Sequence, residues 1–285
     1  YGDHRDLHLS LRRQRQMCIR DRVNTTGAGN VAIGVGALDE NTTASNNTAV
    51  GDQALTANTT GSSNVAVGAN ALDANTTGER NTGVGLASMG ANTTGSSNTA
   101  YGNESLPKNT TGGDNVAVGD KAMYENTTGD NNTGVGREAL HLNTTADNNT
   151  AVGYHAMRAN TTGTSNCAVG TNALMTITTS NNCTAVGKDA LKVNTTANNT
   201  AIGFAVLEAT TTGGSNTAVG YAAMDANTTG ADNVAVGRDA LGKNTTAAEN
   251  VAIGRASLGD NSTGTANTAL GKSALGGNTT ASYNT

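Results

Sequence analysis

The chain has 285 residues, of which only 2% are aromatic, and it contains no tryptophan and a single proline. This composition offers little material for a thick globular core or an aromatic-lined ligand pocket, so it argues against an enzyme. The formal net charge of −5 combines a basic segment, residues 1–22, with an acidic remainder that carries 11 basic and 19 acidic residues.

Residues 1–22 do not follow the pattern of the rest of the chain. A basic arm can bind nucleic acid or anionic lipid, but the apolar run 7–11 is interrupted by His8 and Ser10 and is too short for a signal-peptide h-region. The stretch SLRRQRQMCIRDR resembles translated adapter read-through at the ends of metagenomic sequences. We therefore expect a non-native or disordered leader at 1–22, and the missing initiator methionine and the end in mid-repeat fit a fragment of a longer array.

From Asn24 onward a 17-residue phrase repeats, read once as NTTGSSNVAVGANALDA at residues 58–74. Fifteen units follow one another, the unit that begins at Asn194 is one residue short, and a partial copy begins at Asn278. A unit this short cannot be a domain, so each must be one coil of a stacked structure. Disordered tracts rarely keep apolar residues in phase through fifteen units. We expect residues 23–285 to form an all-β, parallel β-solenoid (β-roll) of about fifteen coils.

Positions 1–7 of the unit, numbered from its first asparagine, predict a turn. Asparagines at positions 1 and 7 would stack from coil to coil, where their amides can form a hydrogen-bonded ladder that satisfies the turn backbone. Position 4 accepts Ala in place of Gly, which indicates a limit on size and no need for a positive φ.

Positions 8–10, read as TAV or VAV, predict a short strand. Val or Ile at position 10 and Leu or Met at position 15 are the predicted core, and position 8 shares the strand face of position 10. Position 9 stays Ala or Gly, which predicts close packing, either inside a narrow coil or around a three-fold axis.

Position 11 is glycine in every unit, which predicts a positive φ or a contact without room for a Cβ. The predicted structural turn glycines include Gly51, Gly68, Gly119, Gly153, Gly187 and Gly237.

The phrase Asn-Thr-Ala-Val-Gly at 47–51, 149–153 and 216–220, with Ala54-Leu55 after its first copy, resembles the head repeats of trimeric autotransporter adhesins. It is closer still to the NTAVG-repeat proteins of phage tail fibres and bacterial surfaces. The resemblance covers residues 24–285, although adhesin head repeats are usually a few residues shorter. It implies a left-handed β-roll that assembles with itself as a homotrimer on a cell surface or virion fibre.

Asn-X-Ser/Thr sequons are dense in the repeats and are possible glycosylation sites in a eukaryotic secretory pathway. In a bacterium or phage the same asparagines are turn formers, and we favour that structural interpretation. Those at the starts of complete units are Asn24, Asn41, Asn58, Asn75, Asn92, Asn109, Asn126, Asn143, Asn160, Asn194, Asn227, Asn244 and Asn261.

No motif predicts catalytic, cofactor-binding or metal-binding residues. The segment 27–32 fits GxGxxA, but no apolar strand precedes it and no helix follows. His141 and His155 lie at different phases of neighbouring units, so they predict no stacked metal-ligand pair. Cys167 and Cys183 lie at positions 8 and 7, which point to opposite strand faces, so we expect two isolated substitutions and no disulfide.

We therefore expect a non-enzymatic, extracellular structural or adhesive segment that acts as a rigid stalk or multivalent surface of a bacterial adhesin or phage fibre. Many weak contacts at the variable positions 5, 6, 12, 13, 16 and 17 can sum by avidity to a host-surface or extracellular ligand that the sequence does not identify. We expect no nucleic acid partner, no membrane contact by this segment and no cofactor. The alternatives are an ice-binding solenoid, with its threonines at positions 2 and 3, and a glycan-coated extracellular filament core.

Overall fold

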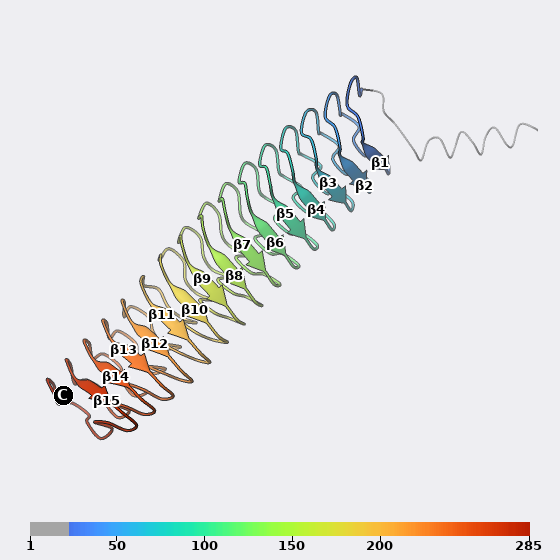
Figure 1. Cartoon of the computed structure of the whole chain (residues 1–285). Helices are drawn as coiled ribbons and strands as arrows, with labels where there is room; N and C mark the ends of the chain where they lie inside the picture. The colour runs from blue at the N-terminus through green and yellow to red at the C-terminus, as the bar shows by residue number, and fades with distance from the viewer. Residues whose placement is uncertain (1–22) are drawn as a thin grey trace, which may run out of the picture. The chain divides into compact units, whose positions relative to one another are not determined.

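The computed structural model describes residues 23–285, which form an all-β parallel β-solenoid of about fifteen coils with no helix in that range (Figure 1). The chain divides into two compact units, Tyr1–Asn131 and Asn132–Thr285. The first contains β1 Val31–Ile33, β2 Thr48–Val50, β3 Val65–Val67, β4 Thr82–Val84, β5 Thr99–Tyr101 and β6 Val116–Val118. The second contains β7 Thr133–Val135, β8 Thr150–Val152, β9 Cys167–Val169, β10 Thr184–Val186, β11 Thr200–Ile202, β12 Thr217–Val219, β13 Val234–Val236, β14 Val251–Ile253 and β15 Thr268–Leu270.

Within each unit every strand pairs in parallel with the next strand along the chain. Ala49 of β2 lies opposite Ala66 of β3, one full 17-residue unit later. The shortened coil keeps the same pairing, because Ala185 lies opposite Ala201 after only 16 residues. The strand register therefore follows the sequence repeat, and the missing residue is absorbed in the turn.

The strands correct one expectation, because the middle residue of each strand, and not position 10, faces the interior. Ala49, Ala66 and Ala117 at position 9 have no exposed surface, whereas Val118 and Ile253 at position 10 are 36% and 39% exposed. Alternate residues of a strand point to opposite faces, so a three-residue strand directs only one side chain inward. The narrow coil accepts only Ala or Gly there, so of the two expected explanations, packing inside a narrow coil accounts for the small residues at position 9 within a single chain.

Position 15 supplies the large side chains of the interior, as expected. The Leu or Met at this position is fully buried in nearly every coil, as in Leu72, Met123 and Leu140. These residues also adopt a left-handed backbone, with φ of 52° at Leu72 and 51° at Leu140. A β-branched residue is strained in that conformation, which explains why all fifteen units use Leu or Met and none uses Val or Ile.

Position 11 ends each strand in a conformation that only glycine accepts readily. Gly51 and Gly68 have φ of 142° and 135°. A Cβ built on Gly51 would also overlap the carbonyl group of Gly68 in the next coil. Both the backbone angle and the coil-to-coil contact therefore exclude a side chain at this corner.

Candidate interaction surface

The asparagines at position 1 form a hydrogen-bonded ladder inside the coils. Asn75 donates from Nδ2 to Oδ1 of Asn58 at 2.9 Å and to the carbonyl oxygen of Gly78 in its own turn at 3.0 Å. Asn92 repeats both bonds one coil later, at 2.8 and 2.9 Å. The ladder consequently fixes the turn and the coil spacing together.

The asparagines of this ladder are also the predicted glycosylation sites. The side chains of Asn58, Asn75 and Asn92 have no exposed surface, and both hydrogens of each amide nitrogen are used. A glycan on Nδ2 would replace one of these hydrogens and would need space that the folded coil lacks. Occupancy of these sequons stays a prediction that glycopeptide mass spectrometry of native material can test.

Position 7 forms a second ladder that ties side chains to backbone. Asn64 accepts a hydrogen bond at Oδ1 from the backbone N–H of Asn81, at 2.9 Å, and donates from Nδ2 to the carbonyl oxygen of Gly78, at 2.9 Å. All of these groups are buried. Because buried backbone groups need partners, this asparagine completes the backbone hydrogen bonding between the turn and the following strand.

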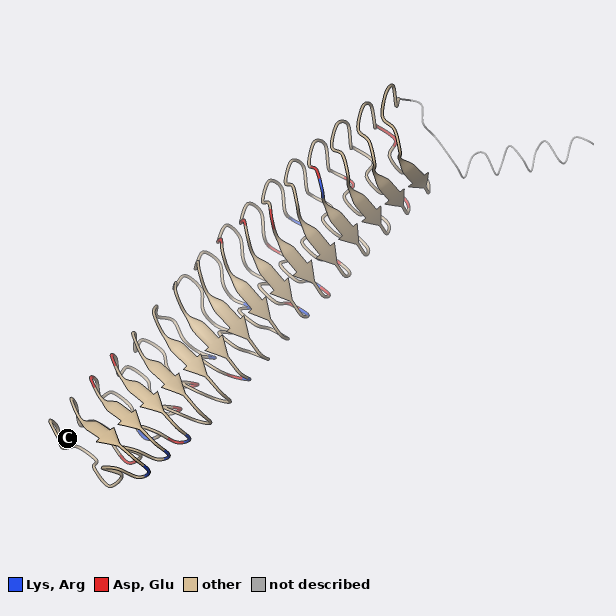
Figure 2. Cartoon of the chain, in the orientation of Figure 1, with Lys and Arg blue, Asp and Glu red and all other residues tan. Residues whose placement is uncertain are grey.

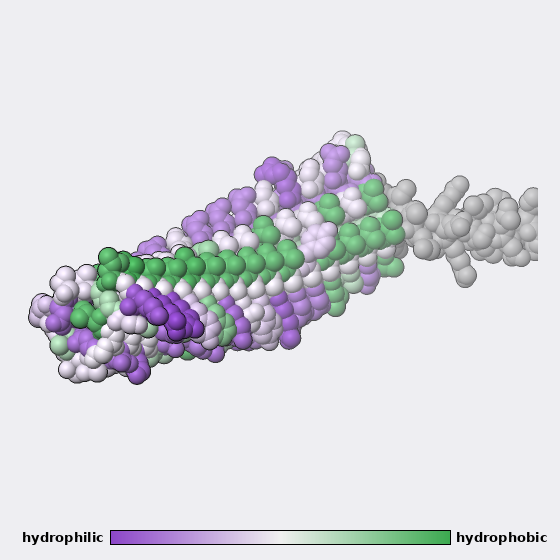
Figure 3. Space-filling view, turned by 60° about the horizontal axis from the view of Figure 1, so that its bottom comes forward, coloured by the Kyte–Doolittle hydropathy of each residue, from purple (hydrophilic) through white to green (hydrophobic). Residues whose placement is uncertain are grey.

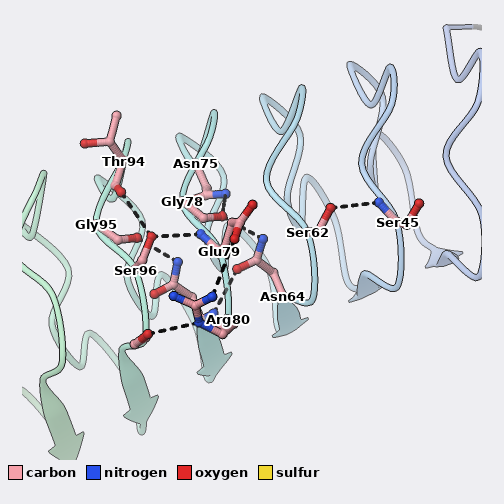
Figure 4. A network of polar contacts seen from close by, with 12 residues as sticks. Ser45, Ser62, Asn64, Asn75, Gly78, Glu79, Arg80, Thr94, Gly95 and Ser96 are labelled. Atoms are coloured by element: carbon pink, nitrogen blue, oxygen red, sulfur yellow. Dashed lines mark hydrogen bonds and ion pairs between the residues drawn. The ribbon is translucent and has the colours of Figure 1, made fainter.

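The outer corner of the turn carries a third, partly exposed set of contacts at position 5. The backbone N–H of Ser45 donates to Oγ of Ser62, and that of Glu79 donates to Oγ of Ser96, each at 3.1 Å (Figure 4). Position 5 was expected to be variable and outward-facing. Where position 5 is Ser, Asp or Asn, its side chain also accepts a hydrogen bond from the backbone N–H of position 5 in the preceding coil. The repeat pattern alone did not indicate this role.

The outward face of the strands, made by positions 8 and 10, is uncharged in all fifteen units. Position 8 is Thr in nine units, Val in five and Cys in one, and position 10 is Val or Ile in thirteen. The side chains at positions 8 and 10 are half-buried or exposed. In the second unit the position-10 side chains form an apolar row along the outer face of the strands (Figure 3). A regular exposed apolar face indicates a contact surface. We call it the strand face.

Charged residues lie in the turns and corners between the strands (Figure 2). Several form ion pairs between neighbouring coils, such as Lys108 Nζ to Glu125 Oε1 at 2.8 Å and Lys243 Nζ to Asp260 Oδ1 at 2.7 Å. These exposed pairs are each worth little on their own. In both pairs the opposite charges occupy position 17 of neighbouring coils.

Glu138 is the centre of the most connected charged cluster in the second unit. Its Oε2 accepts a hydrogen bond from Nε of Arg158 at 2.7 Å and lies 3.2 Å from Nε2 of His155. The Arg158 hydrogen bond holds the pKa of Glu138 below its ordinary value. Burial lowers the pKa of His155, although Glu138 opposes this effect. His155 therefore belongs to an ion-pair cluster with Glu138.

A shallow depression of about 300 Å³ lies in the second unit between positions 16 and 17 of three coils. It is lined by Lys192, Val193, Glu208, Ala209 and Asp225. Burial raises the pKa of Asp225. Lys192 lies 3.4 Å from Glu208. Lys192 and Glu208 thus partly neutralise each other. The depression is too open to enclose a small substrate.

The two cysteines of the described chain, Cys167 and Cys183, are free thiols. Cys167 lies on the strand face and is half-buried, whereas Cys183 is fully buried in the position-7 ladder. Burial raises the pKa of the Cys183 thiol. The Cys183 thiol is therefore not an activated nucleophile.

Residues 23–285 contain no group of three or more His, Cys, Asp or Glu side chains arranged to hold a metal ion. In the same range, no helix has the length and apolar character needed to cross a membrane.

These features define a β-solenoid repeat protein with 17-residue coils and stacked asparagine ladders. Comparison with protein-family models, with curated proteins and with solved structures finds no match.

Proposed function

We propose that this chain is a non-enzymatic, extracellular structural segment that acts as a stalk or head of a bacterial surface adhesin or phage fibre. The interior supports this proposal, because it is filled by small residues, Leu or Met, and amide ladders that link each coil to the next. Such a chain resists deformation coil by coil and offers its outer surface for contact. The resemblance of the NTAVG phrases to adhesin and tail-fibre repeats points to the same setting.

The observation that carries the proposal is the strand face. Positions 5, 6, 12, 13, 16 and 17 vary in charge and size, whereas positions 8 and 10 stay uncharged and mostly β-branched in fifteen units, and position 10 adds an apolar row that the equally constant, exposed threonines of position 3 lack. Water alone does not require this uniformity, but packing against an identical face does. We infer that copies of the chain associate through this face, as a homotrimer.

Light scattering coupled to size-exclusion chromatography tests the assembly. We expect the parent chain to give three times its 28.4 kDa mass. Val152→Lys combined with Val169→Lys places two charges on the strand face and should give a folded monomer. Thr162→Lys combined with Thr179→Lys adds the same charge at exposed position 3 and should leave the trimer intact. A monomeric parent, or a strand-face variant as oligomeric as the parent, would refute the assembly.

Ice binding is a second candidate function. One observation favours it, but for the threonines at position 8 and not for those at positions 2 and 3. The threonine at position 2 is engaged, as in Thr76, whose Oγ1 donates to the carbonyl oxygen of Thr93 at 3.0 Å. Threonines at position 8, in contrast, lie on the strand face beside valine and repeat at the coil spacing. Thermal hysteresis that is absent at high protein concentration would remove this candidate.

A further inference from the structure

Position 12 follows the corner glycine, and its character changes in the second unit. From Lys188 onward six consecutive coils carry exposed basic or aromatic residues there, namely Lys188, Phe204, Tyr221, Arg238, Arg255 and Lys272. No acidic residue interrupts this set, which we call the position-12 stripe. In the first unit the same position holds two aspartates and no basic residue.

The C-terminal half of the stripe places like charges next to one another. Arg238, Arg255 and Lys272 occupy three successive coils, about 4.8 Å apart, where neighbouring coils elsewhere pair Lys with Asp or Glu. Arg238 lies 3.3 Å from Asp239. No described residue forms an ion pair with Arg255 or Lys272. Such a row repels itself unless an anion lies against it.

Apart from Asp239 beside Arg238, the groups beside this row are apolar or uncharged. Ile253 and Leu270, at position 10, are 39% and 77% exposed. Ala256 and Ser273, at position 13, follow Arg255 and Lys272. Figure 3 shows the hydrophilic row separated from the apolar row by a narrow pale strip, and Figure 2 shows basic residues in successive coils after β13, β14 and β15. The surface thus combines a line of cations with a parallel line of apolar side chains.

We propose that Arg238, Arg255 and Lys272 bind a linear acidic polysaccharide that runs along the stack of coils. One coil advances by about 4.8 Å, which is close to the length of one pyranose unit in an extended chain. Carboxylate or sulfate groups on successive sugars accept hydrogen bonds from the three side chains, and arginine suits these oxyanions because its guanidinium can bind them bidentately.

The neighbouring aromatic residues favour a polysaccharide over a nucleic acid. Phe204 and Tyr221 stack on each other, with centroids 5.3 Å apart and planes inclined by 13°. Lys188 lies over the Phe204 ring, at 5.8 Å from its centroid. The Phe204 ring therefore has a neighbour within the stripe on each side and is not free to stack on a nucleobase, which is the main contact by which single strands bind aromatic surfaces.

This ligand goes beyond the proposed structural function and does not require self-association. The test measures binding of the full chain to polygalacturonate and heparin, with dextran as the uncharged polymer. Arg255→Gln combined with Lys272→Gln removes the two unpaired cations. Arg80→Gln combined with Lys121→Gln removes the same charge from the first unit and serves as the control. Both variants keep the basic residues at 1–22, so any binding through that segment is common to them. Circular dichroism checks that all variants fold.

We expect the stripe variant to bind acidic polysaccharide at least tenfold more weakly than the parent, the control variant to bind like the parent, and dextran not to bind. Binding should weaken as salt rises. Equal binding by parent and stripe variant, no binding by the parent, or equal loss in the control variant would overturn the proposal. Stripe-dependent binding of single-stranded DNA as tight as that of polygalacturonate would instead assign the site to nucleic acid. Oligomeric mass, measured in the same samples, reports separately on self-association.

Discussion

Asn64→Ala is the sharpest test of the idea that amide ladders hold the coils together. Asn64 has no exposed surface, and its two hydrogen bonds, each 2.9 Å long, join the N–H of Asn81 and the carbonyl oxygen of Gly78. The carbonyl keeps a second donor, Asn75 Nδ2 at 3.0 Å, whereas the N–H of Asn81 loses its partner. A lost hydrogen bond together with one orphaned buried donor costs about 2–4 kcal/mol.

Native-state hydrogen exchange is the appropriate measurement, because a stacked array can open locally without unfolding as a whole. We expect the amide of Asn81 to exchange at least tenfold faster in Asn64→Ala, with smaller effects a few coils away. Asn103→Ala removes an exposed amide that bonds to Asp120 at 3.0 Å, and it should change stability by less than about 0.5 kcal/mol. Equal exchange of Asn81 in both variants would refute the ladder argument.

Three further predictions follow from the architecture of the coils. Ala117→Arg should prevent folding because Ala117 is fully buried, whereas Asp120→Arg on the exterior should melt like the parent. Leu140→Ile should cost about 1–3 kcal/mol in denaturant unfolding, because a β-branched residue is strained at a φ of 51°, and Leu140→Met should be nearly neutral. Glu138 has a lowered pKa in the folded state because Arg158 donates to it, so it contributes stability above its unfolded pKa, and this stability is lost as pH falls through the folded value. Carboxylate NMR titration should show this pKa rising toward the ordinary value in Arg158→Gln.

The sequence is sufficient to predict the fold, because the 17-residue period, the phase of its asparagines and the position-15 side chains each have one simple physical explanation. Stacking of equivalent residues follows directly from a parallel coil, so Asn58 and Asn75 had to meet. Position 15 is large and apolar and had to be inside. None of these conclusions depends on knowing which way a strand faces.

The orientation of the strands could not be obtained from hydrophobicity. Val is more apolar than Ala, so the pattern favours position 10 as core, yet Val118 lies outside and Ala117 inside. The width of the coil decides the matter, because a slim interior already filled by Leu or Met accepts only a small residue from the opposite wall. The constancy of Ala or Gly at position 9 was the informative signal, since nothing in water would keep an exposed residue so small.

The position-12 stripe was missed for a different reason. Its residues were grouped with five other variable positions, and variability over the whole array concealed a change of character between the two units. Stacking at a known period converts a sequence column into a row of neighbours about 4.8 Å apart. A run such as Arg238, Arg255 and Lys272 then becomes a continuous surface, although the residues are 17 apart in sequence.

Departures from the repeat cluster in the three adjacent coils that begin at Ile177, Asn194 and Thr210, and those of the first two coils have a linked structural cause. Ile177 replaces the asparagine at position 1 and cannot donate to Asn160, whose Oδ1 is buried without a partner among the described residues. Cys183 replaces the asparagine at position 7, and its Sγ contacts the carbonyl oxygen of Thr196 at 3.2 Å, in the next coil, which is one residue short. The shortened turn moves that carbonyl into the place usually held by position 4, where Asn194 also donates to it at 2.6 Å. Both ladders are therefore weakened at the same height, and because each coil depends mainly on its neighbours, local opening of the second unit should begin between residues 177 and 199.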